Sequence, residues 1–222
     1  MKKRSFLILF VSTISCLMTS CSLFKSKSYY KGFFSKLTKE QLLKNFENKQ
    51  DSPYNVGLVT GSVKKKDLLV PVEQTVNTKI KKEERGWEFT GESISDGYFS
   101  IDAKSCIDEY IDTIQMDPVK EYEESTEKDN YSYKPTKYTV SFEIKSFSEG
   151  YELSLNAKAK GKRIEDGQEV GNITGKLEAL ICFNKYFDIV YMYEKNTEKF
   201  SQRLLSYSEK IVTDLTITYS KE

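Results

Sequence analysis

The stretch KYTVSFEIKSF, residues 137–147, alternates apolar and polar side chains at every second position. One face of this run holds Tyr138, Val140, Phe142 and Ile144. Residues 150–160, GYELSLNAKAK, repeat the pattern with Tyr151, Leu153, Leu155, Ala157 and Ala159. A period of two is typical of a strand with one side buried and the other in water. The two runs therefore predict antiparallel neighbours in a sheet that buries one face.

Two more strands are predicted after these runs. Asp166 and Gly167 form a dipeptide typical of a tight hairpin turn, which links to a strand through residues 177–183. A further strand follows over residues 186–194. Apolar residues occupy both faces of these two strands, as shown by Ile181, Cys182, Ile189 and Val190. We therefore expect both strands to lie in the centre of the sheet, covered on each side.

The C-terminal residues 197–215 are predicted to form a long helix. Their apolar side chains recur at helical spacing, at Phe200, Leu204, Tyr207, Ile211 and Leu215. The predicted fold is therefore α+β, with an antiparallel sheet of about seven to eight strands packed against this C-terminal helix. The residues expected to share its core are Phe142, Leu155, Ile181, Ile189 and Leu204.

Shorter helices are predicted near the N-terminus and in mid-chain. In residues 37–50, Thr38 and Gln41 have the spacing of a capping box ahead of an apolar stripe. Residues 56–103 then alternate as strands do, with Asp96 and Gly97 as a hairpin turn.

The mid-chain helix is predicted over residues 105–116, with Ser105 as its cap. Its Asp108 and Asp112 share one face. This pair of carboxylates is either a solvated surface or a pair suited to acid–base chemistry, because a neighbouring carboxylate raises a carboxyl pKa.

An acidic segment, residues 117–136, is predicted to be a long exposed loop. Its acidic residues are Glu121, Glu123, Glu124, Glu127 and Asp129. They lack the alternating spacing and central glycine of a calcium-binding loop, which favours solvated charge over a metal site. We predict a single domain over residues 37–222, with sub-halves 37–116 and 134–222 joined by this loop.

The N-terminus is typical of a secretory signal peptide. Three cationic residues precede an uncharged apolar run that ends at Ser20 and is shorter than the roughly 20 residues that cross a membrane. Met18, Thr19 and Ser20 directly precede Cys21. This step resembles the lipobox of bacterial lipoproteins, with Met18 where leucine is usual. The resemblance covers residues 1–21 and implies cleavage before Cys21 and acylation of its thiol.

The resemblance divides the start of the chain into a signal peptide, residues 1–20, and a lipid-anchored tether, residues 21–36. The alternative is an ordinary signal peptide that leaves Cys21 as a thiol. Removing the signal peptide changes the formal charge from +1 to +1 − 3 = −2. A nearly neutral surface argues against a nucleic-acid partner, because phosphate binding needs a basic excess.

The remaining cysteines, Cys106 and Cys182, would lie in an oxidising compartment. They are either a possible disulfide or two separate buried thiols. The chain has no histidine. This excludes histidine-based catalytic triads and imidazole zinc sites. We therefore predict no metal, no cofactor and no enzymatic activity, with an enzyme that acts through carboxylates, lysine or tyrosine as the alternative.

Two functions remain for an exported protein anchored to a bacterial membrane, with the outer membrane or the cell surface preferred. The first is a non-catalytic scaffold for an envelope protein partner. The second is a carrier with a pocket for a lipid or other apolar ligand between sheet and helix. An early helix, strands and the ISDG of residues 94–97 before an aromatic strand resemble the Lol-type half-barrel lipoprotein carriers. That resemblance implies the second function.

Overall fold

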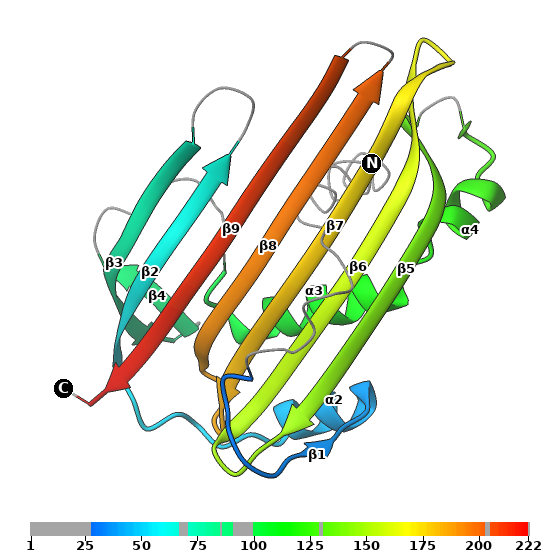
Figure 1. The fold of residues 1–222 in the computed structure, drawn as a ribbon. Helices are drawn as coiled ribbons and strands as arrows, with labels where there is room; N and C mark the ends of the chain where they lie inside the picture. Colours follow the sequence, from blue (N-terminus) through cyan, green and yellow to red (C-terminus); the bar gives the residue numbers. More distant parts are fainter. Residues whose placement is uncertain are drawn as a thin grey trace.

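Nine antiparallel strands form one sheet in the residues that the computed structural model describes, which are 28–66, 71–84, 86–90, 100–128, 131–202 and 205–221. The strand order is β1-β5-β6-β7-β8-β9-β2-β3-β4. The strands are β1 (Ser35–Lys36), β2 (Val56–Lys66), β3 (Pro71–Glu83), β4 (Gly86–Thr90), β5 (Tyr133–Ser146), β6 (Gly150–Glu165), β7 (Gln168–Asn184), β8 (Ile189–Gln202) and β9 (Leu205–Ser220). The described helices are α2 (Lys39–Glu47), α3 (Ala103–Gln115) and α4 (Pro118–Glu124). Strands β5 to β9 are neighbours in the sheet in the same order as in the sequence, and β2 pairs with β9 (Figure 1).

The strands and the turn predicted in the middle of the chain are confirmed, but the expected cover on both sides of β7 and β8 is incomplete, since Leu180 is only half-buried. β5 and β6 pair antiparallel, with Ile144 opposite Leu153. The β6–β7 turn uses Asp166 and Gly167, whose φ values of 49° and 74° lie in the left-handed region that such turns require. β7 and β8 lie in the middle of the sheet.

The predicted C-terminal helix is wrong, and with it the expectation of a sheet packed against a long helix. The segment forms the end of β8 and then β9, which pairs with β8 on one side and β2 on the other. Tyr207, Ile211 and Leu215 are four residues apart, a spacing that keeps them on one face of a helix but also on one face of a strand. β9 is also rich in β-branched and aromatic residues, which favour the strand.

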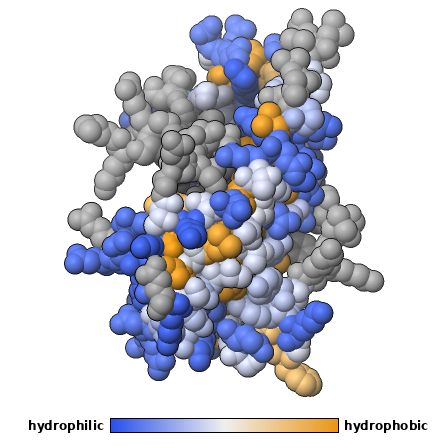
Figure 2. All heavy atoms as spheres, turned by 90° about the vertical axis from the view of Figure 1, so that its left-hand side faces the viewer, coloured by the Kyte–Doolittle hydropathy of each residue, from blue (hydrophilic) through white to orange (hydrophobic). Residues whose placement is uncertain are grey.

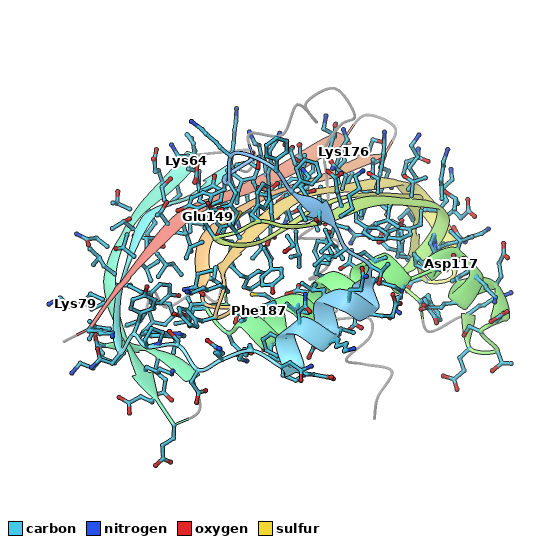
Figure 3. All side chains as sticks on the ribbon, turned by 90° about the horizontal axis from the view of Figure 1, so that it is seen from below. Lys64, Lys79, Asp117, Glu149, Lys176 and Phe187 are labelled. Atoms are coloured by element: carbon cyan, nitrogen blue, oxygen red, sulfur yellow. The ribbon has the colours of Figure 1, made fainter. Side chains whose placement is uncertain are left out.

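The sheet is curved, and α2 and α3 lie within its concave side (Figure 3). The apolar faces of the strands point toward these helices and form the core, in which Leu42, Ile107, Leu153 and Ile189 are buried. Two tyrosine hydroxyls tie α3 to the sheet: Tyr110 donates to the Ser154 carbonyl at 2.6 Å, and Tyr138 donates to the Thr113 carbonyl at 2.7 Å. The helices therefore replace the predicted C-terminal helix as the cover of the sheet.

Local predictions had mixed outcomes. The capping box of Thr38 and Gln41 is confirmed at the start of α2. The N-cap of α3 is Asp102 instead of Ser105, whose N–H donates to the Asp102 carboxylate.

The predicted acidic loop is partly wrong, because its residues Pro118–Glu124 form α4. Phe142, which is predicted to lie in the core, is 44% exposed, because it lies on the edge strand β5. The turn at Asp96 and Gly97, and Leu204, lie outside the described residues.

Candidate functional site

A buried carboxylate lies on the convex face of the sheet. Glu152 on β6 is only 1% exposed. Because its neighbour Leu153 points into the core on the concave side, Glu152 points to the opposite side. Lys145 on β5 and Cys182 on β7 lie directly beside it across the strands. A buried charge is costly unless it is paired and hydrogen-bonded, so the partners of Glu152 define this site.

Its partners come mainly from residues 28–34, which we call the N-terminal segment. The Ser28 hydroxyl donates to Glu152 Oε2 at 2.7 Å, and the Tyr29 backbone N–H donates to the same oxygen at 3.0 Å. Lys145 Nζ lies 3.4 Å from Oε1. Both carboxylate oxygens are thus occupied, and one of them holds the N-terminal segment on the sheet.

Lys145 completes a buried charge network. It is 7% exposed and also contacts Glu143 Oε2 at 2.9 Å. Burial alone would lower the pKa of Lys145, but its hydrogen bond to Glu143 and the charges of Glu143 and Glu152 raise that pKa overall. Its ammonium group also lies 5.0 Å from the centre of the Phe34 ring. Lys145 therefore stays charged and contacts the N-terminal segment at Phe34, far along the segment from Ser28.

Two tyrosines extend the docking across the sheet. The Tyr29 ring stacks on Tyr191 of β8, with ring centres 5.2 Å apart. The Tyr30 hydroxyl donates to the Phe183 carbonyl at 2.7 Å, and burial is the main cause that raises the Tyr30 pKa. The N-terminal segment thus contacts β5, β6, β7 and β8.

Gly150 permits this close approach. A Cβ atom there would lie 1.9 Å from the Phe183 carbonyl oxygen and 2.8 Å from the Tyr30 hydroxyl. Its φ of 159° is also one that side-chain-bearing residues rarely adopt. Any larger residue would therefore displace Tyr30 or the end of β7.

The chain then passes around the edge of the sheet. After the N-terminal segment, β1 pairs with Ser146 and Lys145, and the Leu37 N–H donates to the Ile144 carbonyl at 2.9 Å. α2 follows at once on the concave side, so the blue part of the chain links the two faces (Figure 3). Residues 28–47 are therefore fixed to the sheet at successive points.

A second feature lies between α2 and α3. It is a pocket of about 440 Å³ with an apolar part made by Leu43, Phe46 and Ile107. Charged residues complete its lining, namely Glu47, Lys49, Asp51, Lys104 and Asp108. Its volume falls within the range of roughly 300 to 1,000 Å³ typical of small-molecule sites. The combination of apolar and charged lining suits an amphipathic molecule.

The predicted cysteine candidates lie on different sides of the sheet. Cys106 on α3 belongs to the concave core, whereas Cys182 lies beside Glu152 on the convex face. Both are free and buried. Burial raises the pKa of Cys106 to about 12 and also raises the pKa of Cys182. Two such thiols are weak nucleophiles at neutral pH. Cys21 lies outside the described residues.

The carboxylates of α3 do not form an acid–base pair. Asp108 pairs with Lys104 on the exposed face. Burial, with a smaller contribution from Asp112, raises the pKa of Glu109. In the part of the chain that the structure describes, no group of three or more acidic, cysteine or histidine residues could hold a metal ion.

Sequence reasoning missed Glu152 and Ser28. A glutamate that alternates with apolar residues along a strand normally faces water, and Ser28 falls in a segment expected to be a tether. Nothing local to either residue signals their contact, because they are 124 positions apart.

Comparison with protein families, with curated proteins and with solved structures found no match. No helix of the described residues is long and apolar enough to cross a bilayer. Three features of the described residues are candidates for function: the docked N-terminal segment, the pocket between α2 and α3, and the edge of the sheet at β5.

Proposed function

We propose that this protein is an exported, non-catalytic lipoprotein, anchored to a bacterial membrane through Cys21, whose domain is a scaffold for envelope protein contacts. The observation that carries the proposal is the docking of the N-terminal segment through Ser28, Tyr29 and Glu152. A segment that begins only seven residues after the expected lipid is fixed to the domain. Only residues 22–27 then separate the expected anchor from the docked segment.

The distance between membrane and domain follows from this docking. A fully extended chain spans at most about 3.6 Å per residue, so Cys21 lies no more than about 25 Å from Ser28. A diacylated cysteine holds firmly to a bilayer, because two chains give stable anchoring where one is marginal. The domain would thus lie against the membrane surface, with an outer membrane or cell surface as the expected location. A domain held this close to the membrane suits a module that presents its surface to partners in the same envelope.

The anchor is tested by replacing Cys21 with Ala in the full-length protein expressed in a bacterium. We expect the variant to lose metabolic labelling by a palmitate analogue and to leave the membrane fraction. Cys106→Ala is the matched control and should keep both, since Cys106 is a buried thiol of the domain. Unchanged labelling of Cys21→Ala would contradict the proposal.

A second candidate function, binding of a lipid or similar amphipathic ligand, is favoured by the pocket between α2 and α3. Native mass spectrometry of the purified full-length protein would detect a co-purifying lipid. A fluorescent fatty acid should then bind saturably to the wild type and to Lys39→Glu, but at least tenfold more weakly to Leu43→Asp. Equal binding to both variants would contradict this function.

A further inference from the structure

The outer edge of β5 has an open stretch over residues 137–143, which we call the β5 edge. At one end it is bounded by β1, which pairs with Lys145 and Ser146, and by Leu37, whose N–H donates to the Ile144 carbonyl. At the other end it is bounded by a β-bulge between Pro135 and Lys137. Among the described residues, no strand pairs with the β5 edge on this side (Figure 1).

The backbone groups of the β5 edge that point outward can be assigned. Hydrogen-bonding direction alternates along an antiparallel strand. Because the Ile144 carbonyl points toward Leu37, the N–H and C=O groups of Phe142, Val140 and Tyr138 also point outward. Unpaired groups of this kind are a template for another strand.

The side chains around the β5 edge leave room for such a strand. Phe142 is 44% exposed. A hollow of about 340 Å³ beside it is lined by Lys36, Leu37, Ser141, Phe142, Glu143 and Ile144. The opposite edge of the sheet, at β3 and β4, presents hydrophilic residues with scattered hydrophobic ones (Figure 2), among them Val72, which is 59% exposed. There β3 begins with Pro71, which cannot donate to a ladder.

The sequence of the β5 edge is self-complementary when it is read antiparallel to itself about Val140. On the convex side, Lys137 falls opposite Glu143 and Thr139 opposite Ser141. On the concave side, Tyr138 falls opposite Phe142, and Val140 meets Val140. Opposite charges and aromatic pairs across strands are the stabilising combinations. Tyr138, Val140 and Phe142 are then hydrogen-bonded pairs, as their outward backbone groups require.

We propose that the β5 edge pairs antiparallel with the β5 edge of a second copy of this chain, about a two-fold axis at Val140. The two sheets then continue as one across the axis. The boundaries at Lys137 and Glu143 are equally distant from Val140, so the bulge of one copy meets the β1 boundary of the other. This inference goes beyond the proposed function, because the edge exists whether or not Cys21 carries lipid.

The pairing is expected to be weak in dilute solution. Seven paired residues per copy give a small interface, which is typical of transient contacts. Confinement of two copies to one membrane raises their effective concentration and favours the pair.

The test uses a cysteine on the two-fold axis. Val140→Cys places two thiols in a hydrogen-bonded pair, with Cα atoms about 5.5 Å apart, which is within disulfide range. The matched control Lys137→Cys puts the two thiols six residues out of register, about 20 Å apart. Both variants of the full-length protein are oxidised with copper phenanthroline in membranes and again after solubilisation in mild detergent, and their folding is checked by Trp87 fluorescence.

We expect Val140→Cys to form a disulfide-linked dimer in membranes and Lys137→Cys to form none. Adding Lys137→Glu to Val140→Cys should slow the cross-linking roughly tenfold, because two symmetric attractive pairs become repulsive. Adding Lys79→Glu, at the opposite edge of the sheet, should leave the rate unchanged (Figure 3). Equal cross-linking of Val140→Cys and Lys137→Cys, no cross-linking of Val140→Cys, or its cross-linking to a different protein would overturn the proposal.

Discussion

Replacement of Glu152 by Ala should undock the N-terminal segment and lower the free energy of unfolding. The variant loses the hydrogen bonds from Ser28 at 2.7 Å and Tyr29 at 3.0 Å and the Lys145 contact at 3.4 Å. A hydrogen bond to a charged group contributes about 1.5 to 3 kcal/mol, and breaking a buried ion pair costs about 3 to 5 kcal/mol. Lys145 keeps Glu143 at 2.9 Å, so its charge is not left unpaired. We therefore expect a loss of about 2 to 4 kcal/mol, which is less than the full cost of breaking a buried ion pair.

The assay is urea unfolding of the full-length protein in mild detergent, followed through Trp87, the single tryptophan of the chain. Its indole N–H donates to Asp188 at 2.9 Å and reports on the folded sheet. Glu169→Ala is the control, because Glu169 pairs with Lys134 at 2.8 Å on an exposed surface. That loss should be at most about 1 kcal/mol. Equal losses in the two variants would refute the reasoning that Glu152 is a buried anchor.

Three further predictions concern the rest of the domain. Leu153→Ala should cost about 2 to 5 kcal/mol in urea unfolding, whereas Phe142→Ala, at a half-exposed position, should cost about 1 kcal/mol or less; the reverse order would contradict the assigned faces of the strands. Burial, and to a lesser extent Glu209, raise the pKa of Glu198 to about 7 despite the opposing charge of Arg163. The folded state therefore holds this proton more tightly than the unfolded state, and stability should fall as pH rises from about 4.5 to about 7. Glu198→Gln should reduce that fall in unfolding midpoints measured between pH 4.5 and 8, and an unchanged profile would contradict the assignment. Cys106 and Cys182 should resist iodoacetamide in the native protein and react after unfolding in urea, as measured by peptide mass spectrometry; rapid native labelling would contradict their burial.

The strands around residues 137–160 could be predicted because their apolar side chains follow a strict period of two. The same pattern predicted which face of each run is buried, because a slip of one residue would turn the apolar side chains to the other face. The register itself, with Ile144 opposite Leu153, was seen only in the structure. The start of α2 was predictable for a different reason. Its capping box is a local arrangement in which Thr38 and Gln41 satisfy each other's backbone N–H groups.

The secondary structure of the C-terminal segment could not be predicted from the spacing of its apolar residues alone. Apolar residues four positions apart satisfy both a helix and a strand, and β-branched content was the signal that separated the two. The long-range partner of β9 decided the outcome, because β2 pairs with β9 from Lys210 to Ser220. Such pairing joins residues from opposite ends of the chain and leaves no local trace in either.

The docking site was unpredictable for a related reason. Glu152 is buried only because residues from the start of the chain cover it, and a strand glutamate is otherwise expected in water. Gly150 was the nearest local sign of close packing, but a glycine at the end of a strand is equally typical of a turn. The burial of the site therefore depends on the tertiary structure.

The central claim is that the chain after the expected anchor is fixed to the convex face of the domain. Hydrogen exchange of residues 28–34 in the full-length, membrane-bound protein tests it most directly. The Tyr29 N–H, bonded to the Glu152 carboxylate at 3.0 Å, should exchange slowly in the wild type and in Glu169→Ala, but at the rate of an unstructured peptide in Glu152→Ala. Exchange at the rate of an unstructured peptide in the wild type would contradict the docking and, with it, the short distance proposed between domain and membrane.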